Sequence, residues 1–469
     1  MYEPKVETPL AKASFPSYQA RPNSVGLSID APETPLRSPS TRSLLFRLCL
    51  YGFFVELKPS EAYLNQYLTQ DKGFSNTATN EDIYPWYTYG KLLMLLVLPL
   101  IVERFQYRTV LLIESIGFLC TRVLLIFGQS LFLMQLMQVT YALGTASKIV
   151  YLTIIYREVP RDEYHHATAV IWTAQLAGKC LAGVLGQVLV SYDVSLLALN
   201  YVSCGTVAFS LALAISIPKD KADVVAIAVP EKRNFRPLPS RRDTGDSIEV
   251  SSTGSVRVRA HLHRREPTAP APNVWHWTNI LGLTWTILYC CESLVGNYIQ
   301  NRWTDFSAST LENGIMTAVY TISGAIATLV MSRMLKKVLR SARFLRSILL
   351  IGSIGFVIVS YRQAVAINLW RSYLWYILYG AIFYALITTV SAELALQCST
   401  NEYAKMFAIV MLCAAILETM VTFLLQGTTD NVTPWFGAVA ILHGFLLFFH
   451  LFVSCRVPLE PLRESALPI

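Results

Sequence analysis

An acidic side chain follows a break in the first long apolar segment of the chain. The apolar run begins near Leu44 and is interrupted at Pro59, and Glu61 comes two residues later. Proline inside a helix frees backbone polar groups, which lipid tolerates only where protein or a water-filled cavity satisfies them. Because an ionisable group in hydrocarbon is costly, Glu61 is a candidate functional residue. The alternative is that the helix ends before Pro59 and leaves Glu61 in an outer loop.

A lysine lies well inside the fourth apolar segment. Lys148 is too far from either end of that segment to reach water easily. Tyr141 lies seven residues before it and Tyr151 three residues after it, so the three side chains share one helical face. A buried ammonium needs an anion, which is either a bound substrate or a protein carboxylate such as Glu61. The alternative is an internal structural ion pair.

Other ionisable residues inside apolar segments are Lys179, Glu292, Glu393 and Glu418. Glu418 is in the middle of its segment, whereas Glu393 is near a segment end. Such carboxylates could pair with Lys148 or Lys179, bind a cationic substrate, or carry protons.

Two aromatic residues, Trp86 and Tyr89, precede the second apolar segment within Tyr84-Pro-Trp-Tyr-Thr-Tyr89. Their rings could stack on a flat heterocycle in a binding site. Aromatic residues at the end of a span are also typical of the belt at the membrane–water interface. Both interpretations stay open at this point.

Known catalytic and nucleotide-binding motifs do not occur in the chain. There is no GxxxxGK[ST] motif, no HExxH motif and no recognisable catalytic triad. The nine cysteines show no CxxC or Cys/His spacing, so no metal site and no disulfide framework is predicted. We therefore expect neither a cofactor nor an enzymatic activity. A secondary transporter fits best, and a membrane-embedded enzyme or a non-transporting scaffold or receptor are the other classes.

The composition is that of a membrane protein. Hydrophobic residues make up 53% of the chain and charged residues only 15%, well below the roughly 25% of soluble domains. Segments long enough to cross a bilayer as helices, which takes about 20 residues, recur along almost the whole length. We predict an all-α membrane protein that has the lipid bilayer as a partner.

Twelve spans in two groups of six are predicted. Those of the first group are 44–69, 84–103, 109–129, 131–157, 164–192 and 194–217. Those of the second are 275–301, 309–334, 343–362, 368–396, 403–427 and 434–456. The polar segments give five regions: a disordered cytosolic tail (1–43), a six-helix bundle (44–217), a basic cytosolic linker (218–272), a second bundle (273–456) and a cytosolic tail (457–469).

The distribution of lysine and arginine predicts the orientation. In a twelve-span arrangement the basic segments all fall on one side, which the positive-inside rule makes cytosolic, with both termini inside. These segments are the N-terminal tail, Arg104 and Arg108, Arg157 and Arg161, the linker, and Arg333 to Arg343. The net charge of +8 is thereby explained without nucleic acid. The layout resembles the major facilitator superfamily, in which the substrate site lies between the two halves.

Several motifs resemble those of the reduced folate and thiamine carriers. Lys58-Pro-Ser-Glu-Ala-Tyr-Leu-Asn-Gln-Tyr-Leu68, followed by Asp71-Lys72, is similar to their signature RPSEPFLTPYL…DK. The other resembling stretches are Asn80–Tyr89 (NEIxPVWTY), Glu103–Arg108 (DYLRYKP), Val184–Ser191 (VLGQLLVS), Asn297–Trp303 (NYVQILW), Asn313-Gly314 and Phe407. Because these stretches occur in both halves, the resemblance covers about residues 44–456.

The resemblance implies import of a water-soluble vitamin across the plasma membrane by alternating access. Folate carriers exchange reduced folate against organic anions, and thiamine carriers couple uptake to protons. Glu61 corresponds to a cavity-lining glutamate of the family and Tyr151 to a tyrosine that contacts thiamine. Lys148 corresponds to an arginine in folate carriers and a glutamate in thiamine carriers, so its charge favours folate.

Two departures favour thiamine instead. Gly380 stands where folate carriers have a basic residue, and Glu418 where they have a lysine. We favour reduced folate. The first alternative is thiamine, with Glu61 binding the cationic vitamin and Lys148 paired with Glu418. The second is a vitamin sensor that does not transport. The predicted substrate-binding residues are Glu61, Lys148, Tyr151, Trp86, Tyr89, Asn297 and Glu418.

Overall fold

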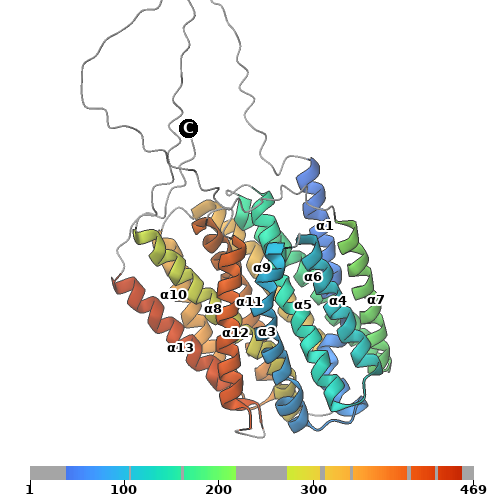
Figure 1. Ribbon diagram of the computed structural model, residues 1–469. Helices are drawn as coiled ribbons and strands as arrows, with labels where there is room; N and C mark the ends of the chain where they lie inside the picture. Colours follow the sequence, from blue (N-terminus) through green and yellow to red (C-terminus); the bar gives the residue numbers. More distant parts are fainter. Residues whose placement is uncertain are drawn as a thin grey trace, which may run out of the picture.

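The computed structural model is entirely helical over the residues that it describes (Figure 1). These are residues 39–104, 107–159, 163–217, 272–306, 312–338, 342–398, 403–427 and 431–456. The expected N-terminal tail, linker and C-terminal tail lie almost wholly outside them. Of the first two, the structure describes only the residues next to the helices, because the first helix begins at Pro39 and the seventh span at Pro272.

Twelve long helices are present among the described residues, as the hydropathy pattern predicts. The first half contains α1 (Pro39–Glu56), α3 (Pro85–Arg104), α4 (Tyr107–Phe127), α5 (Leu131–Glu158), α6 (Tyr164–Ser191) and α7 (Leu196–Ser216). The second half contains α8 (Pro272–Phe306), α9 (Asn313–Val338), α10 (Ala342–Ala364), α11 (Leu369–Gln397), α12 (Tyr403–Leu425) and α13 (Thr433–Arg456). All twelve run along one direction of the bundle, and α1 begins at the end where α13 finishes (Figure 1).

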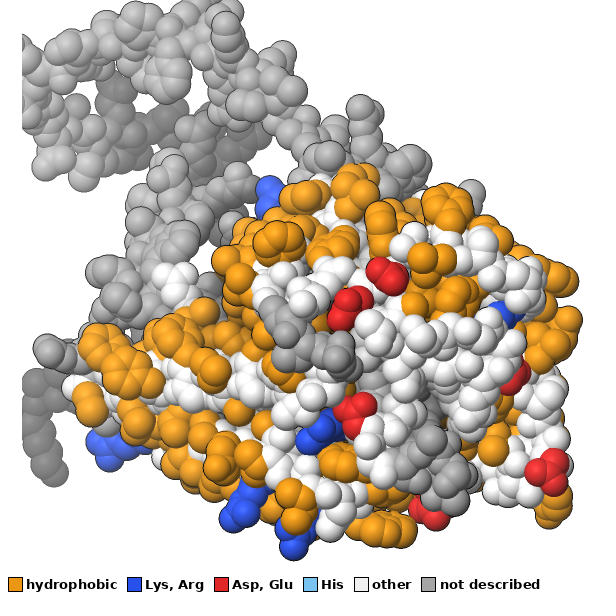
Figure 2. Space-filling view, turned by 90° about the horizontal axis from the view of Figure 1, so that it is seen from below, with side chains coloured by type: hydrophobic (Ala, Val, Ile, Leu, Met, Phe, Trp, Pro, Cys, Tyr) orange, Lys and Arg blue, Asp and Glu red, His pale blue; other side chains and the backbone are white. Residues whose placement is uncertain are grey.

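Eight of the described helices are long and apolar enough to cross a membrane: α4, α6, α7 and α9 to α13. Their outward faces carry large apolar side chains such as Phe127, Phe423 and Ile441, each more than two-thirds exposed. A soluble protein rarely exposes so much apolar surface, whereas lipid covers it. Acidic and basic side chains are only scattered over the end of the bundle seen in Figure 2. The chain is a multi-pass membrane protein.

The first span breaks at Pro59 and continues in short helical pieces. After α1 come a 3₁₀ turn (η2, Pro59–Tyr63), a short helix (α2, Leu64–Gln66) and a π-helical turn (η3, Tyr67–Asp71), and a second π-helical turn (η4, Ala78–Ile83) precedes α3. Backbone groups freed at the break find partners on α7: Thr206 donates to the carbonyl of Leu57, and the N–H of Ser60 donates to Ser203 Oγ at 3.0 Å. The break therefore lies inside the bundle, and Glu61 is not in an outer loop.

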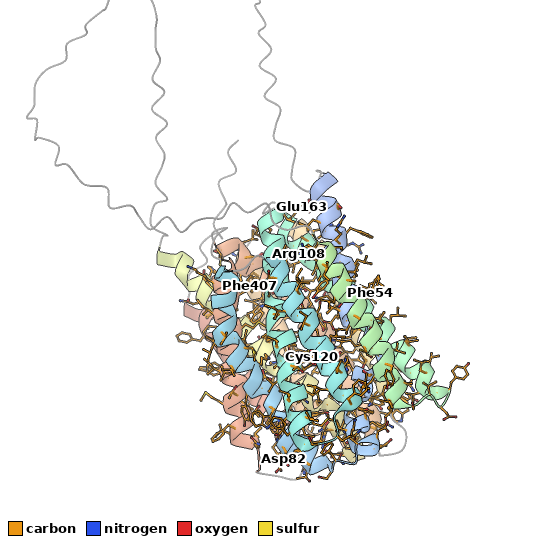
Figure 3. The ribbon with its side chains drawn as sticks, turned by 45° about the vertical axis from the view of Figure 1, so that its right-hand side comes forward. Phe54, Asp82, Arg108, Cys120, Glu163 and Phe407 are labelled. Carbon is orange, nitrogen blue, oxygen red and sulfur yellow. The ribbon has the colours of Figure 1, made fainter. Side chains whose placement is uncertain are left out.

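The two halves meet closely along α6 and α9. A Cβ atom added to Gly183 would lie 2.5 Å from the carbonyl oxygen of Gly314, and one added to Gly314 would lie 2.5 Å from that of Gly183. Only glycine permits this backbone approach. Gly183 lies nearer the Ser191 end of α6 than its Tyr164 end, and Glu163, which precedes Tyr164, lies at the end of the bundle opposite Asp82 (Figure 3).

Candidate functional site

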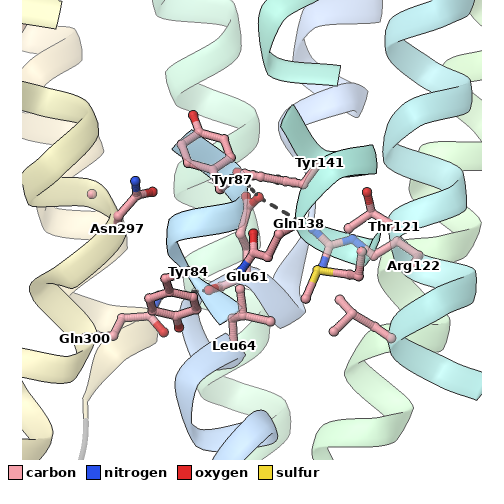
Figure 4. A pocket seen from close by; sticks show the side chains of 13 residues that line it. Glu61, Leu64, Tyr84, Tyr87, Thr121, Arg122, Gln138, Tyr141, Asn297 and Gln300 are labelled. Atoms are coloured by element: carbon pink, nitrogen blue, oxygen red, sulfur yellow. Dashed lines mark hydrogen bonds and ion pairs between the residues drawn. The ribbon is translucent and has the colours of Figure 1, made fainter. Parts of the chain in front are cut away.

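A cavity of about 220 Å³ lies between the two halves. Ionisable, aromatic and amide side chains from both halves line it. The first half contributes Glu56, Lys58, Glu61, Tyr87, Tyr141, Lys148, Trp172 and Lys179, and the second contributes Tyr289, Glu292, Asn297, Trp303, Tyr376 and Tyr384. A smaller cavity of about 80 Å³ adjoins it and shares Glu61, Tyr87, Tyr141 and Asn297 (Figure 4). A concave site with aromatic walls and a few charged groups is typical of small-molecule binding.

Glu61 lies where the two cavities meet, as the sequence predicts. Its Oε1 accepts a hydrogen bond from Tyr141 Oη at 2.6 Å and lies 3.5 Å from Arg122 Nη2 (Figure 4). The same oxygen lies 3.3 Å from Lys58 Nζ. About a fifth of the Glu61 side chain is accessible. The 3₁₀ turn at Pro59 turns Glu61 toward the cavity, and the carboxylate is already neutralised by two cations.

Lys148 faces the cavity and forms an internal ion pair, one of the alternatives that the sequence left open, but its partner is neither Glu61 nor Glu418. It forms an ion pair with Glu56, the last residue of α1. Glu56 also lies 3.9 Å from Lys58 Nζ. The predicted pairing of Lys148 with Glu418 is therefore wrong, because Glu56 is the partner of Lys148 and Glu418 pairs with Lys91 instead.

Glu418 is completely buried beside the cavity and pairs with Lys91. Its Oε2 lies 2.7 Å from Lys91 Nζ, and its Oε1 accepts a hydrogen bond from Ser293 Oγ at 2.7 Å. Asn297, predicted as a site residue, lines both cavities and lies with its Nδ2 3.5 Å from Glu418 Oε1. Glu418 thus supports the cavity wall and does not line the cavity. Lys91 is inside the second predicted span, where a charged residue needs a partner of opposite charge, so the sequence indicates that Lys91 forms a buried ion pair.

The aromatic contribution of α3 comes from different residues than predicted. Trp86 is 43% exposed and lines neither cavity. Tyr89 also lies outside both, and its hydroxyl donates to Gln426 Oε1 at 2.5 Å. Tyr84 and Tyr87 line the site instead, since they lie three residues apart on the inward side of the chain at the start of this helix. Tyr151 lies on α5, but its side chain is outside the described part of the structure.

Lys58 and Arg122 are functional candidates that the sequence reasoning missed. Lys58 Nζ lies 4.1 Å from the centre of the Phe118 ring and is 2% exposed. Arg122 is 1% exposed, and its Nη1 donates to Ser60 Oγ at 2.9 Å. Both are charged residues inside or beside predicted spans, which was the signal available for finding them.

Lys179 and Glu292 line the larger cavity from opposite halves. Glu292 Oε1 accepts a hydrogen bond from Tyr320 at 2.6 Å, whereas its Oε2 is buried without a partner among the described residues. Lys179 has no carboxylate within ion-pairing distance in the described part of the chain. It lines the same cavity as the carboxylates of Glu56, Glu61 and Glu292.

Contacts between the halves close the site toward the Asp82 end. Tyr63 Oη accepts a hydrogen bond from the N–H of Gly314 in the other half at 3.3 Å and donates one to Gln187 Oε1 of its own half at 2.7 Å. Gln300 binds the broken span twice, through the N–H of Asn65 at 3.2 Å and the carbonyl of Glu61 at 2.9 Å.

At the Glu163 end, the described contacts between the halves join His165 on α6 to α9 and α11. His165 Nε2 lies 3.1 Å from Glu393 Oε1, and the carbonyl of His165 accepts a hydrogen bond from Ser332 Oγ at 3.5 Å. Glu393 therefore belongs to a contact between the halves at a helix end, as its position in the sequence suggested.

Solved structures of transporters share the fold. The chain is 13% identical to a D-xylose–proton symporter, with a TM-score of 0.63, 90% of this chain covered and 99% of the other. It is 11% identical to a human organic anion transporter, with a TM-score of 0.55, 88% of this chain covered and 100% of the other. Both match the major facilitator architecture, and identities this low extend to the fold alone.

Sequence relatives include transporters of both vitamins. Folate transporter 1 of Caenorhabditis elegans is 27% identical, with 88% of this chain and 93% of the relative covered. Human thiamine transporter 2 is 26% identical with 90% and 92% covered, and the human reduced folate transporter is 26% identical with 94% and 77% covered. The family model described as "Reduced folate carrier" matches residues 40–432. The chain belongs to the reduced folate carrier family.

Proposed function

We propose that the chain imports a reduced folate by alternating access. The observation that carries this proposal is the charge of the site. Among the described residues, four cations line the two cavities (Lys58, Arg122, Lys148 and Lys179) against three carboxylates (Glu56, Glu61 and Glu292). An excess of positive charge in a cavity inside a membrane protein favours an anionic ligand, and reduced folates carry carboxylates.

A cationic vitamin such as thiamine is less well supported, although several relatives are thiamine transporters. Such a vitamin needs an available carboxylate. Glu56 is paired with Lys148, Glu61 with Lys58 and Arg122, and the second oxygen of Glu292 is buried away from solvent. Binding of thiamine would have to displace one of these internal partners.

The position of the site supports alternating access. The cavity lies between two six-helix halves that contact each other toward both ends of the bundle. Rocking of one half against the other would break the contacts at one end and tighten those at the other.

We further propose that the transporter acts in the plasma membrane with both termini in the cytosol, which the basic segments support. Exchange against an organic anion suits an anionic substrate better than proton symport does. In an exchange, an outgoing anion replaces the incoming one, so the excess positive charge of the site stays compensated.

Uptake of labelled reduced folate, in cells that lack their own folate and thiamine carriers, tests this proposal. Labelled thiamine is measured in parallel at equal surface amounts of the protein. Saturable folate uptake with little thiamine uptake is expected. Saturable thiamine uptake without folate uptake would contradict the proposal, and uptake of neither vitamin would leave the non-transporting sensor as the better account.

A further inference from the structure

One cation of the cavity differs from the others in having no partner among the described residues. Lys58 and Arg122 contact Glu61, and Lys148 contacts Glu56. Lys179 lines the same cavity without an ion pair or a hydrogen bond in the described part of the chain. Holding an ammonium inside a membrane protein is costly, so an unpaired one that faces a cavity marks a place for an anion from outside the chain.

Lys179 cannot place its charge in water at a membrane surface. It lies 12 residues from Ser191 and 15 from Tyr164, which are the two ends of α6. At a rise of about 1.5 Å per residue the nearer end is about 18 Å away, well beyond the reach of a lysine side chain. Its side chain is only partly buried, so the ammonium meets the solvent or ligand of the cavity and not the lipid.

Two close backbone contacts fix the position of Lys179. A Cβ atom on its neighbour Gly178 would lie 2.1 Å from the carbonyl oxygen of Phe53 on α1, and Gly183, about one turn further along α6, contacts Gly314 on α9. At this level α6 is therefore held against α1 of its own half and against α9 of the other half. The backbone of Lys179 is fixed by these contacts. A fixed backbone lowers the entropic cost of ordering the side chain when a ligand binds, which favours selective binding.

We propose that Lys179 binds a carboxylate of the transported vitamin and determines the preference for an anionic substrate. This proposal rests on the proposed function and names the residue that carries out its recognition step. Glu56, Glu61 and Glu292 line the same cavity as Lys179, and their negative charges reduce the positive potential at its ammonium. Lys148, whose charge Glu56 already compensates, contributes less to the binding of the anion.

Uptake kinetics of Lys179 variants test the proposal. Lys179→Met keeps the length of the stem and removes the charge, and Lys179→Arg keeps the charge. The KM for labelled reduced folate is expected to rise about tenfold to hundredfold in Lys179→Met, the range for loss of a hydrogen bond to a charged group. Lys179→Arg should retain most of the affinity. Arg371→Gln removes one positive charge from an exposed position and should leave the KM unchanged.

A second measurement separates recognition from a general effect on the fold. A pterin that carries no carboxylate is used as a competitor of folate uptake. If Lys179 binds the carboxylate, the inhibition constant of this pterin is the same in the wild type and in Lys179→Met. An unchanged KM for folate, or equal weakening of folate and pterin, would overturn the proposal for Lys179 alone. Absence of folate uptake by the wild type would instead overturn the proposed function itself.

Discussion

Lys91 and Glu418 form a fully buried ion pair between the two halves, with 2.7 Å between Lys91 Nζ and Glu418 Oε2. Lys91 also donates to Ser293 Oγ at 2.9 Å and lies 4.9 Å from the centre of the Tyr289 ring. This pair links α3 to α12 and α8 behind the cavity wall. Because both side chains are 0% exposed, each charge depends on the other.

Removal of one partner of this pair should destabilise the protein strongly. We expect Glu418→Met to cost about 3–5 kcal/mol, because it leaves a buried and unpaired ammonium. The double variant Lys91→Met/Glu418→Met should recover more than half of that loss. Thermal unfolding of the purified protein measures both. Asp305→Asn, in a partly exposed pair with Arg302, is the control and should cost less than about 1 kcal/mol. A double variant as unstable as the single one would contradict the assigned pairing.

A charge exchange tests the pairing of Lys148 with Glu56. Lys148→Glu places two carboxylates side by side, so we expect folate uptake per surface copy to be abolished. Lys148→Glu/Glu56→Lys restores the pair with its charges exchanged and keeps the net charge of the cavity. Part of the uptake should therefore return. If Lys148 itself anchors the substrate, the exchange rescues nothing, and that result would contradict the internal pairing.

The backbone contact between α6 and α9 should be sensitive to a single methyl group. Gly314→Ala places a Cβ atom 2.5 Å from the carbonyl of Gly183, and such overpacking costs about 1–3 kcal/mol in the state closed at the Asp82 end. The transporter should shift away from that state and turn over more slowly, with a normal surface amount. Gly437→Ala adds a methyl group where nothing lies within 4 Å, and its uptake rate should stay at the wild-type value. Equal rates in both variants would contradict a role of this contact in closure.

Adjacent aromatic residues on α3 should differ in their effect on affinity. Tyr87 lines both cavities, so Tyr87→Ala should raise the KM for folate about threefold to tenfold, given ~0.5–1.5 kcal/mol for an aromatic contact. Trp86→Ala should leave the KM near the wild-type value, because Trp86 lines neither cavity. Uptake measured over a range of folate concentrations distinguishes the two. A larger effect of Trp86→Ala would place the substrate elsewhere.

Much of the fold follows from the sequence. Apolar segments of spanning length predict all twelve long helices, and Pro59 predicts the break in the first span. Glu61 could be predicted as a site residue because a carboxylate beside such a break is costly in lipid and is retained where it faces a cavity. These features can be predicted because the hydropathy of a span and the break at a proline both depend only on residues that are close together in the sequence.

The pairing of buried charges could not be predicted in the same way. Lys148, Glu56, Lys91 and Glu418 are all visible as charges in or beside spans. Which of them meet depends on the relative rotation of helices that lie far apart in the sequence. The choice between Trp86 and Tyr87 depends on helical phase at a span end, where a boundary error of a residue or two exchanges the inward and outward faces.

Counterflow in proteoliposomes tests the central claim most directly. Purified protein is reconstituted into vesicles that contain unlabelled reduced folate, unlabelled thiamine or neither, and the entry of labelled reduced folate is followed. Import of an anionic vitamin by alternating access predicts rapid transient accumulation of label only in the vesicles loaded with folate. Accumulation driven by internal thiamine, or no accumulation under any condition despite binding of folate, would contradict it.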